Sequence, residues 1–82
     1  MKSRKVLVLK LLRIAHDMTL ARLAKKVGSS APLCSRIESG KRQPTRTLLR
    51  RLADVFDTKP DLLLRPVDIV DIAEIVDEQV AR

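Results

Sequence analysis

The sequence contains no tryptophan, no tyrosine and a single phenylalanine. A core without large aromatic residues has to be aliphatic, and this composition favours helices over sheets. The single cysteine excludes an internal disulfide and a multi-cysteine metal site. No apolar run approaches the roughly 20 residues that a membrane span needs, since Lys10 interrupts the stretch from Val6 to Leu12. We therefore expect a cytoplasmic chain with no membrane contact.

Charge is divided unevenly along the 82 residues. Residues 1–51 contain 14 lysines and arginines but only two acidic residues, Asp17 and Glu38, so their net charge is +12. Residues 52–82 contain eight acidic and three basic residues, which gives −5 and an overall charge of +7. A basic surface of this density attracts polyanions. The first part is therefore predicted to contact a polyanion, which would repel the second part.

Apolar spacing and capping residues predict five helices before residue 66. The predicted ranges are residues 4–16, 20–27, 31–39, about 11 residues after Thr45, and a short helix near Pro60. Thr19, Ser30 and Thr45 are expected to cap the second, third and fourth helices, because a hydroxyl oxygen can accept a free N–H of the first turn. Gly28 is expected to end the second helix.

The first predicted helix carries apolar residues on two sides. One stripe is expected to face the core and consists of Leu9, Leu12 and Ala15. The opposite stripe consists of Leu7, Leu11 and Ile14. One small core cannot cover both stripes, so the second stripe needs another partner.

The acidic tail after Pro66 is rich in valine and isoleucine. On a helix capped by Asp68, its apolar side would contain Ile69, Ile72, Ala73, Val76 and Val80. We predict that this helix forms a homodimer and also covers the second stripe of the first helix. Because β-branched residues favour strands, a strand that pairs with its twin across a dimer axis is the alternative. The chain then divides into residues 1–65 and a dimerisation segment at 66–82.

Two short helices joined by a tight turn with a glycine form the helix-turn-helix pattern. The run from Leu12 to Leu64 resembles the Cro and phage-repressor type of this motif, the XRE family. Its matching marks are "MTLARLA", "VGSS", "SRIESGKRQPT" and "LADVFDTKPDLL". The resemblance implies an all-α, five-helix, lambda-repressor-like domain, to which the predicted C-terminal helix is added. It also implies a transcriptional regulator whose partner is double-stranded DNA.

By this resemblance, the third helix enters the major groove as the recognition helix. The expected base contacts are Ala31, Pro32, Leu33, Ser35 and Arg36. Apolar side chains can meet thymine methyl groups, whereas the Arg36 guanidinium matches guanine O6 and N7. The expected phosphate contacts are Thr19, Ser29, Ser30, Lys41, Arg42, Gln43 and Arg46. Family members often carry glutamine where this chain has Leu20, so we expect a short list of base contacts, helped by DNA shape.

Several other residues are expected to have a structural role, and for two of them two interpretations are possible. The resemblance implies an ion pair between Arg13 and Glu38. Cys34 falls on an inward position of the third helix, so we expect a packing role. His16 has no second metal-binding residue at helical spacing, and no base is spaced to activate a serine, so we predict no metal, no cofactor and no enzyme. Arg50 and Arg51 form either a solvated face or further DNA contacts.

The predicted function is that of a repressor that binds an inverted repeat as a homodimer. Repression is favoured over activation because no ligand-binding or activation domain is recognisable. An antitoxin that regulates its own operon, with the acidic tail bound to a toxin, is the alternative. A third interpretation is an interaction module whose basic face binds an acidic protein.

Overall fold

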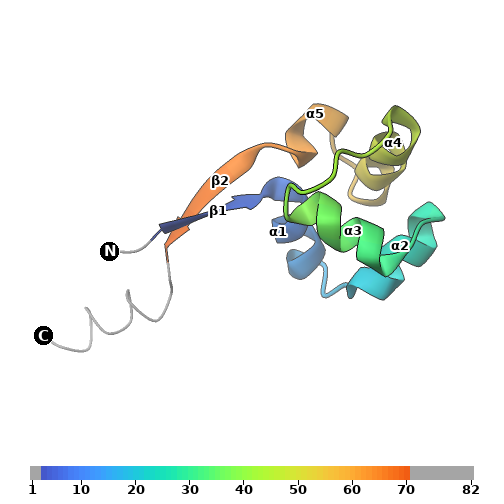
Figure 1. Ribbon diagram of the computed structural model, residues 1–82, viewed down its shortest axis with the longest axis horizontal. Helices are drawn as coiled ribbons and strands as arrows, with labels where there is room; N and C mark the ends of the chain where they lie inside the picture. Colours follow the sequence, from blue (N-terminus) through green and yellow to red (C-terminus); the bar gives the residue numbers. More distant parts are fainter. Residues whose placement is uncertain (1–2, 71–82) are drawn as a thin grey trace, which may run out of the picture.

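The computed structural model describes residues 3–70 of the chain. The elements follow in the order β1 (Ser3–Leu7), α1 (Val8–Ala15), α2 (Leu20–Val27), α3 (Ala31–Glu38), α4 (Arg46–Val55), α5 (Pro60–Leu63) and β2 (Pro66–Val70). The five helices pack together, and β1 and β2 form a two-stranded ribbon that extends away from them (Figure 1). The structure confirms the five predicted helices, with α3 ending at Glu38 rather than Ser39.

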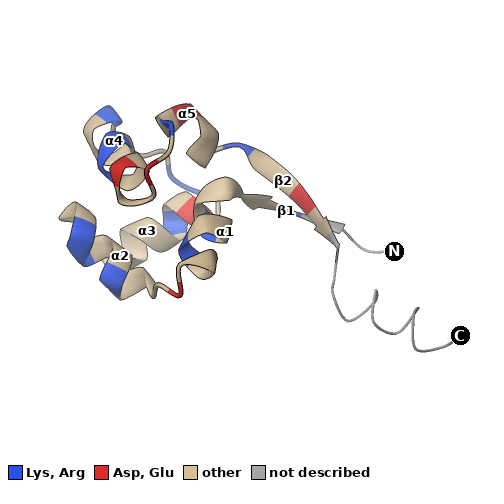
Figure 2. Cartoon of the chain, turned by 180° about the vertical axis from the view of Figure 1, so that it is seen from behind, with Lys and Arg blue, Asp and Glu red and all other residues tan. Residues whose placement is uncertain are grey.

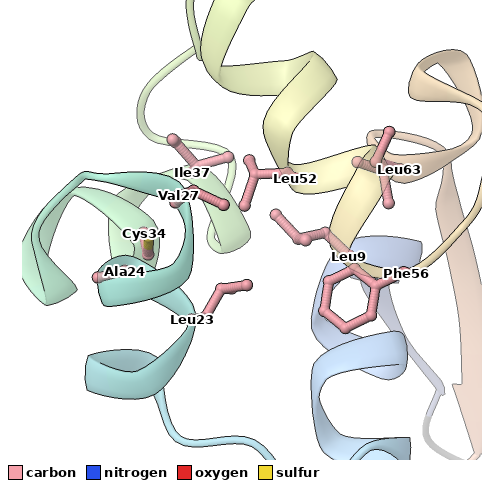
Figure 3. Packing of buried hydrophobic residues seen from close by; sticks show 10 residues of the cluster. Leu9, Leu23, Ala24, Val27, Cys34, Ile37, Leu52, Phe56 and Leu63 are labelled. Carbon is pink, nitrogen blue, oxygen red and sulfur yellow. The ribbon is translucent and has the colours of Figure 1, made fainter.

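One aliphatic core joins the five helices (Figure 3). Its buried members are Leu9, Leu23, Ala24, Val27, Cys34, Ile37, Leu52, Ala53, Phe56 and Leu63. Phe56 is the single aromatic residue of this cluster, and it follows directly after α4. Each buried leucine or isoleucine side chain contributes about 1.5–3 kcal/mol relative to an exposed one. The core therefore holds α2 and α3, the two helices of the helix-turn-helix, on a scaffold made by the other three.

The predicted capping residues begin three of the helices. The Thr19 Oγ1 accepts the Arg22 N–H at 3.1 Å, and the Ser30 Oγ accepts the Leu33 N–H at 3.3 Å. In the same way, the Thr45 Oγ1 accepts the Leu48 N–H at 3.2 Å. Each hydroxyl satisfies one N–H that has no partner within the helix, which confirms these three caps.

Residues 3–7 form a strand, so the prediction of a helix from Arg4 is wrong there. β1 pairs antiparallel with β2, with Ser3 opposite Val70 and Leu7 opposite Pro66. The helix begins at Val8, whose N–H donates to the carbonyl oxygen of Arg65 at 3.0 Å. Backbone pairing with a segment distant in the sequence outweighs the helical spacing of these residues, because propensity is a weak local preference.

The first residues of the tail are also a strand, so the fold is not all-α. Residues 66–70 form β2, which overturns the helix capped by Asp68 for this part of the tail. Ile69, predicted on a helical dimerisation face, lies in this strand. The strand alternative had the right conformation, but the observed partner is β1 of the same chain rather than a twin. The other predicted dimerisation residues lie outside the described residues: Ile72, Ala73, Val76 and Val80.

The structure changes both stripes predicted on the first helix: the later start removes Leu7, and Ala15, six residues after Leu9, lies about 120° round the helix from it. Leu9 is buried and Leu12 packs against the core, but Ala15, predicted to face inward, is exposed at the last turn of α1. Leu7 belongs to β1 rather than to the helix. Ile14 is 54% exposed.

Candidate nucleic-acid interface

A turn of three residues, Gly28–Ser30, joins α2 to α3. Gly28 adopts the left-handed backbone conformation with φ 68°, in which a residue with a Cβ is strained. The N–H of Ser29 donates to the carbonyl oxygen of Ala24 at 2.9 Å, which closes the end of α2. Ser30 then caps α3 directly. This tight turn sets the start of α3 beside the end of α2.

α3 has one buried face and one exposed face. The buried face contains Cys34, Ile37 and Glu38. The residues on the exposed face are Pro32, Ser35, Arg36 and Ser39, of which Ser39 follows the last turn. Their spacing of three, one and three residues puts them on one side of the helix. α3 therefore presents an outward surface of two serines and a proline with a single cation.

The residues predicted as base contacts do not all lie on this outward surface. Pro32, Ser35 and Arg36 are exposed, whereas Ala31 and Leu33 are half-buried. Leu33 packs against the core cluster, so only part of its side chain faces outward. Ser39 was not predicted as part of this surface; its hydroxyl donates to the carbonyl oxygen of Arg36 at 3.0 Å.

The hydroxyl groups at the two helix starts keep a free donor. Thr19 and Ser30 are exposed, and in each cap the side-chain oxygen accepts a backbone N–H. A hydroxyl that accepts in this way still has its own O–H to donate. The positive end of the helix dipole lies at the same place. Both positions thus suit an anionic oxygen, while Ser29 between the helices is half-buried.

The loop after α3 is held against the end of that helix. The carbonyl oxygen of Arg36 accepts the N–H groups of Lys41 at 2.9 Å and Arg42 at 3.3 Å. Lys41, Arg42 and Gln43 are exposed, and so is Arg46 at the start of α4. Figure 2 shows lysines and arginines on α2, α3 and α4. The loop cations therefore stand beside the outward surface of α3.

An ion pair links α1 to the buried face of α3. The Arg13 Nε donates to Glu38 Oε2 at 2.6 Å, and the Arg13 Nη2 donates to Glu38 Oε1 at 3.1 Å. The Arg13 Nη1 also donates to the carbonyl oxygen of Met18 at 2.8 Å. The side chains are only 14% and 5% exposed. One guanidinium thus holds α1, the residue before the α2 cap, and α3 in a fixed arrangement.

Arg51 has a role that the sequence did not indicate. Its Nη1 donates to the carbonyl oxygen of Val27, the last residue of α2, at 3.4 Å. A Cβ placed on Gly28 would lie 3.5 Å from the same nitrogen. A cation at a helix C-terminus satisfies a free carbonyl and the negative end of the dipole. The contact joins residues on two different helices, so local spacing carries no signal for it.

Cys34 and His16 are both placed in the structural scaffold. Burial raises the pKa of the Cys34 thiol, and the nearby Glu38 carboxylate acts in the same direction. The His16 ring packs edge-on against Phe56, with centroids 5.1 Å apart, and its Nδ1 lies 2.8 Å from the Leu12 carbonyl oxygen.

Within residues 3–70, no group of three or more histidine, cysteine or acidic residues is arranged around a common metal position. Over the same residues, no helix is both long and apolar enough to cross a membrane.

A helix-turn-helix family model matches residues 9–63, which is more than half of the chain and extends from α1 to α5. The chain belongs to the XRE-type helix-turn-helix family. This XRE-type protein is a DNA-binding transcription regulator, and its partner is double-stranded DNA. No curated protein and no solved structure matches the chain significantly. The ribbon of β1 and β2 lies outside the matched range.

Proposed function

We propose that this protein is a sequence-specific repressor that binds an inverted repeat as a homodimer. The observation that carries the proposal is the outward surface of α3, which has one cation between small polar groups and is flanked by a basic loop. A surface of this kind fits the major groove of B-DNA, about 12 Å wide. Repression requires only that the bound dimer occupies promoter DNA.

Base recognition is assigned chiefly to Arg36, Ser35 and Pro32, which are exposed on that surface. The guanidinium of Arg36 suits a guanine, and Pro32 suits a thymine methyl group. Ala31 and Leu33 contribute base contacts only at the edge of that surface, because their side chains are half-buried. Few hydrogen-bonding side chains face the groove, so DNA shape supplies part of the specificity.

Phosphate binding is assigned to groups on both sides of α3. The N-terminal ends of α2 and α3, with Thr19, Ser29 and Ser30, supply N–H and O–H donors on one side. The loop and the start of α4 supply Lys41, Arg42, Gln43 and Arg46 on the other side. These contacts are independent of base sequence and orient α3 on the duplex.

Selection of binding sites from random duplexes tests this proposal directly. We expect an inverted repeat whose half-sites are about 10–10.5 base pairs apart, or a multiple of this spacing. Arg36→Ala should weaken binding to the selected site by about 1–3 kcal/mol and relax the preference at one base pair. Lys59→Ala is the matched control, since it removes an exposed cation outside the helix-turn-helix. A selection that yields no preferred sequence contradicts the proposal.

The antitoxin alternative depends on the acidic tail. Residues 71–82 have four acidic residues and one arginine, in contrast to a net charge of +10 for residues 1–70. If the tail binds a basic toxin, deletion of residues 71–82 leaves operator affinity unchanged. If the tail serves the homodimer, the same deletion lowers operator affinity. Operator titrations of the full and shortened chains separate the two functions.

A further inference from the structure

An apolar groove lies where the ribbon meets α1. Its volume is about 410 Å³, and it is lined by Lys5, Val6, Lys10, Leu11, Ile14 and Ile69. Ile14 is 54% exposed, which makes it the most exposed large hydrophobic residue of the described part. The groove therefore combines an apolar floor with two lysines.

The strand register explains why the groove is apolar. Val6 pairs with Val67 and Arg4 pairs with Ile69, so these four positions share one face of the ribbon, and three of them are apolar. The pair Lys5 and Asp68 starts from the opposite face, and both residues are exposed. The long Lys5 side chain nevertheless lines the groove, so its ammonium group lies at the groove's edge. The apolar face continues onto Leu11 and Ile14 of α1. Because a two-stranded ribbon alone is marginally stable in water, a partner on this face would stabilise it.

The chemistry of this groove matches residues 71–82. This segment has a net charge of −3 and carries apolar residues among its acidic ones: Ile72, Ile75, Val76 and Val80. Apolar residues can fill the floor of the groove while carboxylates meet Lys5 and Lys10. Residues 1–51 are strongly basic, and residues 52–70, with four acidic and two basic residues, are already part of α4, α5 and β2. Residues 71–82 are therefore the acidic and apolar segment that remains to fill the groove.

The position at which β2 ends favours the tail of a second copy. Val70 pairs with Ser3 at the end of the ribbon that points away from the helices (Figure 1). To reach its own groove, the chain would have to reverse direction directly after Val70. Of the residues that tight turns favour, the segment directly after Val70 offers Asp71 but no glycine or proline. In a two-fold dimer with facing ribbons, each tail continues towards the groove of the other copy.

We propose that residues 71–82 of one copy bind the groove formed by Val6, Leu11, Ile14 and Ile69 of a second copy, and that this reciprocal contact is the dimer interface. The inference rests on the proposed homodimer and specifies its surface. Lys5 and Lys10 pair with carboxylates of the incoming tail.

The mass in solution of three variants and the wild type tests this interface. We expect a dimeric wild type, and monomers for Ile14→Glu and for a chain that ends at Val70. Ile14→Glu should raise the dimer dissociation constant about 30-fold or more, the effect of losing a buried anchor residue. Leu62→Glu is the matched control, because Leu62 is the other exposed large hydrophobic residue, 37% exposed and on α5. It should remain dimeric.

Three other patterns of masses overturn the proposal, each in a recognisable way. If Ile14→Glu is dimeric but the shortened chain is monomeric, the tails bind each other rather than the groove. If the shortened chain is dimeric, the tail is not the interface. If the wild type is monomeric, the segment does not bind a second copy. Circular dichroism and thermal unfolding of each variant verify that a change in mass does not come from loss of the fold.

A labelled peptide with the sequence of residues 71–82 provides a second readout. Fluorescence anisotropy should show that it binds the chain ending at Val70, and more weakly at higher salt because the lysine contacts are screened. Introducing Ile14→Glu into that chain should abolish binding, and Leu62→Glu should not. Peptide binding that Ile14→Glu leaves unchanged overturns the proposal. Binding of a single DNA half-site by the monomeric variants is measured separately, so that failure of this interface is distinguishable from failure of the DNA-binding function.

Discussion

Arg13 and Glu38 are joined by two hydrogen bonds, from Nε to Oε2 at 2.6 Å and from Nη2 to Oε1 at 3.1 Å, between α1 and the end of α3. Glu38 is the buried charged residue of the described part, and the Arg13 guanidinium neutralises its carboxylate in an ion pair. The third donor of Arg13 holds the Met18 carbonyl oxygen, one residue before the α2 cap. One guanidinium therefore adds polar contacts among α1, α2 and α3 to the packing of the core that already joins them.

Replacing Arg13 with methionine should lower the free energy of unfolding by about 3 kcal/mol, because it leaves the Glu38 carboxylate buried without a partner. The double variant Arg13→Met with Glu38→Leu removes both charges and should recover part of this loss. Urea unfolding at pH 7 measures all three proteins. A double variant no more stable than Arg13→Met would show that the buried charge is not the source of the loss.

Gly28→Ala should lower the free energy of unfolding by about 1 kcal/mol, because φ 68° is unfavourable for a residue with a Cβ. Gly40→Ala is the matched control, since Gly40 has φ 78° and a Cβ there meets nothing within 4 Å. The two losses should be similar, because 3.5 Å from the Arg51 Nη1 is an ordinary contact. A much larger loss for Gly28→Ala in thermal unfolding would mean that the added methyl group displaces Arg51 from the end of α2.

The features that could be predicted from the sequence depend on residues close together in the chain. Each N-cap hydroxyl accepts an N–H only three residues later, so Thr19, Ser30 and Thr45 could be identified from the sequence alone. The exposed face of α3 follows from helical periodicity in the same way. Leu33 shows the limit of that argument, since its contact with the core comes from packing between helices.

The features that were missed depend on residues far apart in the chain. β1 exists because Ser3–Leu7 meets Pro66–Val70, and nothing within either segment specifies the other. The spacing of residues 4–16 also fits a helix, so local periodicity could not distinguish the two outcomes. The three-residue spacing of Leu9, Leu12 and Ala15 predicts one stripe, but two successive steps of three residues turn Ala15 about 120° away from Leu9, and Ala15 is exposed. The contact of Arg51 with Val27 is likewise visible only in the folded chain.

Substitutions of Lys41 and Arg51 should have different effects on the salt dependence of operator binding. A phosphate contact by Lys41 contributes about −0.9 to the slope of log affinity against log salt, so Lys41→Ala should reduce that slope by about this amount. Arg51→Gln should leave the slope unchanged and lower the free energy of unfolding by about 0.5 kcal/mol, because its role is a hydrogen bond to α2. Operator titrations between 50 and about 200 mM salt measure both slopes. A reduced slope for Arg51→Gln would assign Arg51 to the DNA contact instead.

Cys34 should make the stability of the protein fall at alkaline pH. Burial raises the pKa of its thiol in the folded chain, whereas the thiol of the unfolded chain has the ordinary cysteine pKa of about 8.5–9.0. Above that pH the unfolded chain binds fewer protons than the folded chain, so the free energy of unfolding falls as pH rises, by at most about 1.4 kcal/mol per pH unit for one group. The contribution of Cys34 to stability is therefore fully present below the pKa of the unfolded thiol and is lost as pH rises through the pKa of the folded thiol.

The chain has no tyrosine, so few other groups titrate in this pH range. Urea unfolding at three pH values, about 7.5, 8.5 and 9.5, measures the effect, and Cys34→Ala is the control that should lack it. Equal pH dependence in the wild type and in Cys34→Ala would assign the fall to other groups, such as the lysines.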